Sequence, residues 1–156
     1  MSLVKSHYKS PLGWLELSTS EGFLYQISFL DSRPKPLLEI TNTSHKKIKS
    51  ELDEYFRGEH KQFTLPLKPE GTNFQQRVWN ELQQIPFGCV TNYGELAKRL
   101  GDVKKVRAVG RANGQNPIPI IIPCHRVIGV NNNLVGYAGG ISRKKFLLKH
   151  EGALLL

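Results

Sequence analysis

A cysteine, a histidine and an arginine stand in a row at the end of a stretch rich in isoleucine and proline. Residues 117–123 read PIPIIIP, and Cys124, His125 and Arg126 follow directly. A thiol attacks as its thiolate, and cationic neighbours favour that form. The segment therefore predicts a reactive nucleophile, although free cysteine is also among the residue types most often buried as ordinary core.

The backbone between Cys124 and His125 decides whether the two can act together. Adjacent side chains in a strand point to opposite faces, so they cooperate only if the chain turns sharply here. Pro123 is compatible with such a turn. A cysteine hydrolase also pairs a thiol with a histidine, but it needs an oxyanion hole as well, and the sequence carries no motif for one.

Basic residues are concentrated in the second half of the chain. Residues 1–70 hold ten Lys and Arg against nine Asp and Glu, a net charge of +1, whereas residues 71–156 hold twelve against four, a net charge of +8. This asymmetry favours a polyanionic partner, most simply nucleic acid. Charge alone does not separate DNA from RNA or from an anionic membrane surface. No apolar run reaches the roughly 18 residues of a membrane span.

The cysteine and histidine content predicts neither a metal centre nor a disulfide framework. Two cysteines are too few for a disulfide scaffold, and the five histidines show no paired ligand spacing with them; these residues are Cys89, Cys124, His7, His45, His60, His125 and His150. We predict no metal and no cofactor. The N-terminus lacks the apolar region of a secretory signal peptide, which predicts a cytoplasmic protein.

The first part of the chain reads as a small α+β scaffold without chemistry. Strand-like runs at 14–17 and 23–29 flank a hairpin turn at 19–22. A helix is predicted from about His45 to Arg57 and ends at Gly58. Residues 61–71 read as an extended linker with two prolines, so we expect one domain over 1–70 and a second over 71–156.

The second part is predicted to be mainly helical. Thr72 and Gln75 resemble a capping box at the start of an amphipathic helix that ends at Pro86. Shorter helices are predicted at 93–100, started by Asn92, and at about 103–113. Beyond these, we expect a buried extended segment at 118–122, then strand, turn and strand over 127–137, then a final helix.

The two short helices are a helix-turn-helix candidate. The pattern is generic, but the later helix combines small residues with arginines, which allows a backbone to approach a nucleic-acid groove closely. Val106 and Val109 are available for the core, and Ala108, Arg111 and Ala112 share another face. A tightly packed interior helix would have a similar composition, so this pattern alone leaves both interpretations open.

The stretch around Cys124 resembles the active-site signature of the O6-alkylguanine-DNA alkyltransferases. Residues 116–127 read NPIPIIIPCHRV, and further segments follow the family's order and spacing: PFG at 86–88, YGELA at 93–97, RAVG at 107–110, GYAGG at 136–140 and LKHEG at 148–152. The resemblance covers residues 72–152, and the first seventy residues are compatible with it. It implies an α+β fold with a ribonuclease H-like scaffold followed by a helix-turn-helix, winged-helix-like alkyl-acceptor domain.

The resemblance implies direct-reversal repair of double-stranded DNA. In that family an alkyl group passes from O6 of guanine to a cysteine, and we expect O4 of thymine to be a substrate as well. The product thioether is a very poor leaving group, so the protein is expected to act once and to remain inactivated. We further expect a monomer with no cofactor, no obligate protein partner and no membrane association.

The resemblance also assigns roles to individual residues. Cys124 is implied to be the alkyl acceptor, His125 its base acting through a water, Glu151 the group that orients the histidine, and Asn116 a brace for the active-site turn. Arg107 is implied to fill the base stack after nucleotide rotation, which Tyr93 promotes. The remaining implied residues are the base-pocket wall (Val127, Tyr137, Ala138 and Gly139) and the DNA-facing Ala108, Gly110 and Arg111.

Some positions depart from other members of this family. Residue 138 is alanine where some members carry serine, and Asn113 and Gly114 stand at positions that vary in type. The range of alkyl groups accepted is therefore open. Two other interpretations are a damage sensor of the same fold, which lacks the acceptor thiol, and a helix-turn-helix regulator with a structural cysteine. Cys124 argues against the first of these.

Overall fold

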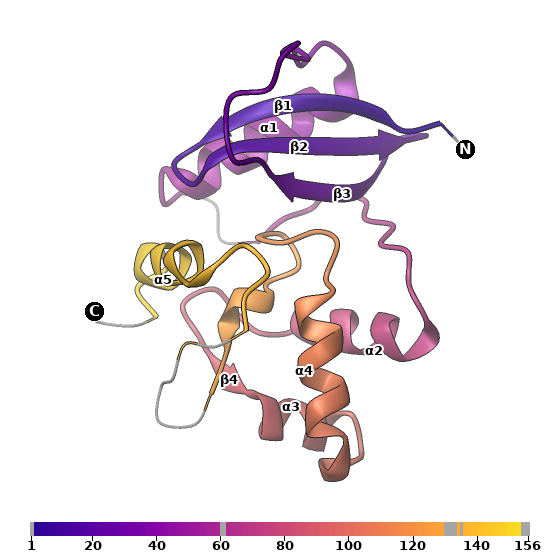
Figure 1. Ribbon diagram of the computed structural model, residues 1–156, viewed down its shortest axis with the longest axis vertical. Coiled ribbons are helices and arrows are strands. Elements are labelled where there is room, and N and C mark those ends of the chain that lie inside the picture. The colour runs from indigo at the N-terminus through magenta and orange to yellow at the C-terminus, as the bar shows by residue number, and fades with distance from the viewer. Residues whose placement is uncertain (1, 60–61, 130–133, 135, 154–156) are drawn as a thin grey trace. The chain divides into compact units, whose positions relative to one another are not determined.

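The computed structural model describes residues 2–59, 62–129, 134 and 136–153 (Figure 1). The chain divides into two compact units, residues 1–70 and 71–156. The first contains a small sheet and one helix, and the second is mainly helical, which confirms the predicted α+β class. Within the described ranges, no helix has the length and apolar character needed to cross a membrane.

The first unit is built on a three-stranded antiparallel sheet. Its strands run in the order β1 (Val4–Ser10), β2 (Gly13–Ser20) and β3 (Phe23–Phe29). The predicted hairpin between β2 and β3 is confirmed, with Glu21 and Gly22 at positive φ in its turn. β1 was not predicted, because its sequence VKSHYKS lacks the alternation of apolar and polar residues that indicates a strand. Its buried residues include serines and a histidine.

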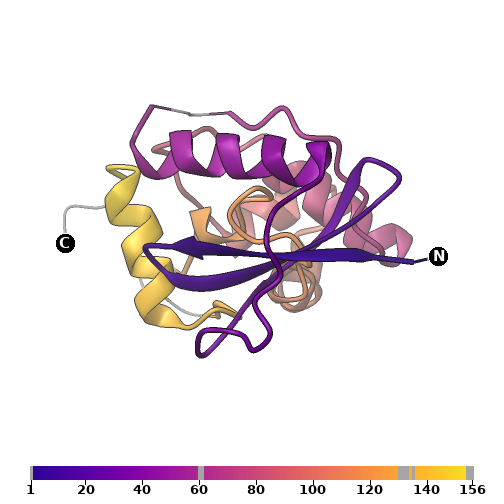
Figure 2. The same cartoon turned by 90° about the horizontal axis from the view of Figure 1, so that it is seen from above.

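Helix α1 (Thr43–Phe56) covers one face of this sheet (Figure 2). It begins where Asn42 accepts a hydrogen bond from the His45 backbone nitrogen at 2.7 Å, which satisfies an otherwise unpaired helical donor. The core of the unit consists of apolar side chains from the helix and from the sheet: Ile48, Leu52, Tyr55, Leu15, Leu17 and Ile27. The unit is thus a scaffold with its own core.

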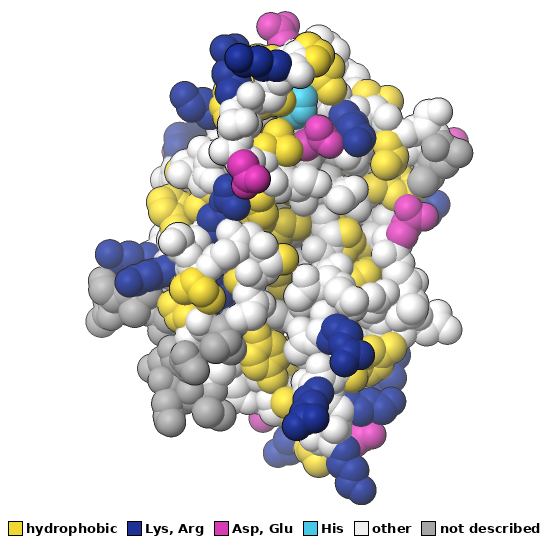
Figure 3. Space-filling model, in the orientation of Figure 1, with side chains coloured by type: hydrophobic (Ala, Val, Ile, Leu, Met, Phe, Trp, Pro, Cys, Tyr) yellow, Lys and Arg dark blue, Asp and Glu magenta, His cyan; other side chains and the backbone are white. Residues whose placement is uncertain are grey.

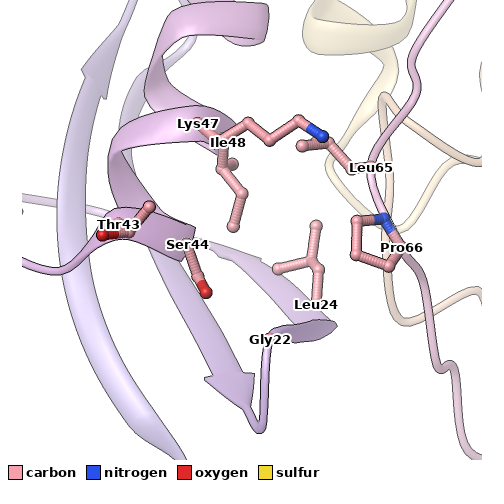
Figure 4. A pocket seen from close by; sticks show the side chains of 8 residues that line it. All are labelled: Gly22, Leu24, Thr43, Ser44, Lys47, Ile48, Leu65 and Pro66. Atoms are coloured by element: carbon pink, nitrogen blue, oxygen red, sulfur yellow. The ribbon is translucent and has the colours of Figure 1, made fainter.

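The end of the first unit lies beside β3 and bounds a cavity of about 150 Å³ (Figure 4). Apart from residue 61, which lies outside the described residues, the predicted linker is ordered: the Leu24 nitrogen donates to the Pro66 oxygen at 2.9 Å. The lining is largely apolar, with Thr43, Ser44 and Lys47 as its polar groups. No cysteine, histidine or carboxylate is among the described residues that line it.

The helices of the second unit begin at the predicted caps. In α2 (Asn73–Leu82) the capping box is confirmed, because the Gln75 nitrogen donates to Thr72 Oγ1 at 3.1 Å and Gln75 Oε1 accepts from the Thr72 nitrogen at 2.8 Å. In α3 (Tyr93–Arg99) the Asn92 side chain accepts from the Glu95 nitrogen at 2.8 Å. Local side-chain chemistry therefore sets both helix starts.

The third predicted helix is divided into two pieces. A short 3₁₀ helix, η1 (Val103–Lys105), precedes α4 (Val106–Gly114). α3 and α4 pack against each other, as expected of a helix-turn-helix pair, and α4 also packs on α2. Trp79 Nε1 of α2 donates to the Ala112 carbonyl at 2.9 Å, which fixes the inward side of α4.

The remaining elements of the second unit surround the cysteine. Cys124–Arg126 form a 3₁₀ turn, η2, and β5 (Val127–Ile128) pairs in parallel with β4 (Thr91–Asn92). Helix α5 (Ile141–His150) packs on η2. The predicted second strand is wrong at residues 134, 136 and 137, which are not in a strand; residues 130–133, including the predicted turn, and residue 135 lie outside the described residues.

Candidate active site around Cys124

Cys124 sits at a sharp turn. Pro123 has φ −83° and ψ 64°, and the Cys124 nitrogen donates to the Ile122 oxygen at 2.8 Å, which is the geometry of an inverse γ-turn. The chain then enters η2, so Cys124 and His125 do not alternate as strand residues do. This turn removes the geometric obstacle to cooperation between the two side chains. Both are buried.

The segment before the turn is compact and strained, not extended as predicted. Ile120 has φ +75°, a conformation that costs a β-branched residue free energy and persists only where neighbours enforce it. The Ile122 nitrogen donates to the Ile118 oxygen at 2.9 Å. Asn116 bridges the same loop, since its Nδ2 donates to the Ile122 oxygen at 2.7 Å and its Oδ1 accepts from the Ile118 nitrogen at 2.9 Å.

His125 is held by a buried carboxylate that also binds an arginine. His125 Nε2 lies 2.8 Å from Glu151 Oε2, and Arg126 donates to Glu151 from Nε at 2.9 Å and from Nη2 at 3.0 Å. These hydrogen bonds keep the pKa of Glu151 far below its ordinary value despite burial. An ionised carboxylate accepts only, so Nε2 carries the imidazole hydrogen and Nδ1 has the lone pair.

The lone pair of His125 is available for a proton. Burial lowers the pKa of His125, although Glu151 opposes the shift, so the ring is neutral near pH 7. The buried Nδ1 has no hydrogen-bond partner among the described residues. The imidazole is therefore oriented at one nitrogen and basic at the other, which is the arrangement of a general base held by a carboxylate.

The thiol of Cys124 needs such a base. Burial raises its pKa to about 11, opposed by a hydrogen bond from Asn116 and by the charge of Lys144. Lys144 of α5 is itself fully buried, and its Nζ donates to the Val127 oxygen at 2.6 Å. Burial lowers the pKa of Lys144 to about 8, so it still carries its charge near pH 7. The thiol is thus protonated at rest, beside a cation that favours the thiolate.

Removing this cation is expected to make the thiolate harder to form. In a Cys89→Ser background, Lys144→Met should raise the pH midpoint of Cys124 ionisation by about one unit, a tenfold loss of thiolate at a given pH. The measurement is thiolate absorbance against pH. Lys145→Met, which removes an exposed charge from the same helix, is the control. An unchanged midpoint in Lys144→Met would show that Lys144 serves only packing.

Two tyrosines flank the thiol. The Tyr93 ring packs on α4, where a Cβ at Gly110 would lie 3.7 Å from it, and a Cβ at Gly136 would lie 3.3 Å from its hydroxyl. Electrostatic interaction with Cys124 contributes to the raised pKa of both Tyr93 and Tyr137, after burial. The other predicted wall residues are the buried Val127, the exposed Ala138 and the half-buried Gly139.

One side of α4 presents the residues predicted to face DNA. Arg107 and Arg111 are exposed, and Ala108 and Gly110 are half-buried. Exposed Lys and Arg side chains gather where α4 begins (Figure 3), and they include Lys98, Arg99, Lys104 and Lys105. Two expectations are wrong: Val106 is 37% exposed and not in the core, and Ala112 is 2% exposed and packs inward with Val109.

Sequence reasoning missed the contribution of three residues near the thiol. Arg126 lies beside the predicted base but reveals its role only through its contact with Glu151. Lys144 shares a helical face with the buried Leu147 and Leu148, and that spacing is a signal for burial. Asn113, four residues after Val109, donates from Nδ2 to the Cys124 oxygen at 3.4 Å. Lys144 and Asn113 thus share one signal, a polar residue on an apolar helix face.

Family models match both units of the chain. Residues 73–153 match the 6-O-methylguanine DNA methyltransferase DNA binding domain, and residues 3–69 match the ribonuclease-like domain of the same family. Together these matches span nearly the whole chain. They cover both the loop of Cys124 and the small sheet, whose sequence alone identified nothing.

Relatives of known name and structure agree with these matches. A methylated-DNA–protein-cysteine methyltransferase of Methanosarcina acetivorans is 46% identical over 94% of this chain and 96% of its own. A constitutive one of Bacillus subtilis is 44% identical over 92% of both chains. The crystal structure of Mycobacterium tuberculosis OGT in complex with DNA is similar with a TM-score of 0.86 and 41% identity, covering 96% of this chain and 92% of that one.

Proposed function

This chain belongs to the 6-O-methylguanine DNA methyltransferase family, and we propose on that premise that it repairs O6-alkylguanine in double-stranded DNA by moving the alkyl group to Cys124. The observation that carries the assignment of residues is the buried Cys124–His125–Glu151 arrangement, in which the imidazole is oriented by the carboxylate and basic at Nδ1. It is a methylated-DNA–protein-cysteine methyltransferase that reverses damage directly, without excision of the base.

The chemical step is a displacement at the alkyl carbon. His125 Nδ1 takes the thiol proton, directly or through one water, while the sulfur forms a bond to the alkyl carbon and the bond from that carbon to O6 of guanine breaks. The electron pair of the broken bond stays with guanine. The proton that His125 took from the thiol is then passed on to the guanine. The charge of Lys144 lowers the cost of the thiolate before attack.

The tyrosine and the arginine prepare the substrate. The target base is inaccessible inside a duplex, so the nucleotide must be rotated out of the stack. Tyr93 crowds the phosphate backbone and donates a hydrogen bond to the extruded base, and Arg107 fills the gap in the stack. The base is enclosed by Val127, Tyr137, Ala138 and Gly139. Asn116 keeps the thiol in place by bracing its loop, as its two backbone hydrogen bonds support.

Arg107→Ala is expected to slow methyl transfer about 10- to 100-fold, because the stack loses the side chain that stabilises the rotated state. Binding to undamaged duplex should weaken less. Transfer kinetics and DNA affinity are measured at one salt concentration, since phosphate contacts are salt-dependent. Arg111→Ala, one turn further along α4, is the matched control. Equal losses of affinity and rate in both variants would contradict a special role for Arg107.

The reaction needs one thiol and one damaged nucleotide. We therefore infer a monomer that acts without a cofactor or an obligate protein partner, in the cytoplasm at the DNA. A thioether is a very poor leaving group, so each molecule reacts once. The same displacement extends to O4-alkylthymine, whose alkyl carbon also carries an oxygen leaving group.

The function is tested on the DNA. A duplex with one O6-methylguanine is incubated with excess protein and digested to nucleosides, which are separated by chromatography. We expect 2′-deoxyguanosine to replace the methylated deoxynucleoside, with the DNA backbone intact before digestion. Release of a free base or appearance of an abasic site would contradict direct reversal.

A further inference from the structure

Asn113, on the last turn of α4, is a buried amide with an unmatched acceptor. It is 1% exposed, although its helical neighbours Val109 and Ala112 form an apolar face that an aliphatic side chain would complete. Its Nδ2 donates to the Cys124 oxygen at 3.4 Å. Its Oδ1 is buried and has no hydrogen-bond partner among the described residues. A buried acceptor without a donor is destabilising.

The orientation of this amide is set by its neighbours. The Cys124 carbonyl can only accept a hydrogen bond, so the amide nitrogen must face it, and turning the amide over would bring two acceptors together. Asn113 also hydrogen-bonds Tyr93. The amide thus contacts the carbonyl of the acceptor cysteine and the tyrosine assigned to the base through its donor side. Asn113 therefore borders the site that the reacting base must enter, and Oδ1 is the acceptor that these contacts leave unused.

The damaged guanine has only one group that can donate an N–H hydrogen bond to the acceptor Asn113 Oδ1. Alkylation at O6 removes the hydrogen from N1 of guanine, so the 2-amino group carries the only N–H hydrogens of the damaged base. O4-alkylthymine has lost its N3 hydrogen and has no N–H donor at all. An acceptor beside the thiol is therefore satisfied by an alkylguanine and left unpaired by an alkylthymine.

We propose that Asn113 Oδ1 accepts a hydrogen bond from the 2-amino group of O6-alkylguanine and so determines the preference of the protein for alkylguanine. This inference rests on the proposed function and deepens it. Sites that are built to hydrogen-bond a substrate reject analogues that lack the group, because a buried polar atom is then left without a partner. Asn113 acts here as a specificity-determining residue.

The test removes the Asn113 side-chain amide from the protein and the 2-amino group from the substrate, first separately and then together. Single-turnover rates are measured on a duplex with O6-methylguanine and on the same duplex with O6-methylhypoxanthine, which lacks only the 2-amino group. We expect the natural protein to react about 10- to 100-fold more slowly with the second substrate. In Asn113→Leu, of similar volume, the ratio should fall to about one. Asn113→Ala gives the same comparison with a smaller side chain.

Each outcome decides a different claim. Gln115→Leu, an exposed neighbour, should keep the natural ratio. A natural ratio that persists in both Asn113 variants, whatever their absolute rates, would overturn the role of Asn113 while the repair function stands. A natural protein that demethylates neither duplex would overturn the proposed function, and this inference with it. O4-methylthymine also lacks the amino group, so it should behave like O6-methylhypoxanthine. Its single-turnover rate relative to that of O6-methylguanine should rise in Asn113→Leu.

Discussion

Cys124→Ser is expected to abolish methyl transfer, with a loss on the order of 10⁴-fold or more, because a hydroxyl is a far weaker nucleophile than a thiolate at the same position. Burial already raises the pKa of the natural thiol to about 11, so an alcohol in the same surroundings stays protonated. Serine is close to cysteine in volume and should preserve the turn. Binding to a duplex with O6-methylguanine is therefore expected to remain.

The control for this prediction is the second cysteine. Cys89 is exposed and is not among the groups that interact with His125 or Lys144, so Cys89→Ser should transfer at the natural rate. Transfer is followed as loss of O6-methylguanine from the duplex, and binding by fluorescence anisotropy. A Cys124→Ser protein that still demethylates DNA would contradict the assignment of the acceptor.

Glu151→Gln is the second large expected effect, and it acts on both folding and chemistry. The carboxylate binds His125 and Arg126 in a site where its own side chain is fully buried. An amide leaves the guanidinium charge uncompensated, at a cost of about 3–5 kcal/mol of unfolding free energy. It can also turn its NH₂ group to the imidazole and reverse the tautomer, so we expect transfer to slow roughly 100-fold or more.

A double variant separates the two effects. Arg126→Met combined with Glu151→Gln removes the buried charge pair together, and such replacements are often close to neutral in stability. We expect chemical denaturation to show recovered stability while transfer remains slow, since His125 is still misoriented. Full recovery of transfer in the double variant would show that Glu151 serves only to balance Arg126.

Local signals predicted the helix starts of the second unit. The capping box at Thr72 and the cap at Asn92 work through side chains within three residues of the helix, so a single sequence contains the whole interaction. β1 could not be found in this way. Its buried Ser6 and His7 have partners far along the chain: Ser6 contacts His45 of α1, and His7 Nδ1 accepts a hydrogen bond from the Leu38 nitrogen.

The thiol itself was evident, but the shape of its loop was not. The four isoleucines of residues 118–122 favour extended chain. The loop is nevertheless held in a compact turn by Asn116 and by the hydrogen bond from the Ile122 nitrogen to the Ile118 oxygen. The family resemblance assigned Glu151 to His125. Helical spacing signals the burial of Lys144, but its contact with the Val127 oxygen and the contact of Asn113 with the Cys124 oxygen depend on how distant segments pack.

Mass spectrometry of the protein after reaction tests the central claim most directly. The protein is mixed with excess duplex containing one O6-methylguanine, and intact mass and peptide masses are measured with Cys124→Ala as the control. We predict one added methyl group per molecule, located on the Cys124 peptide, that does not increase with further substrate and is absent from the control. Repeated turnover without a mass change, or a methyl group on any other residue, would contradict the account.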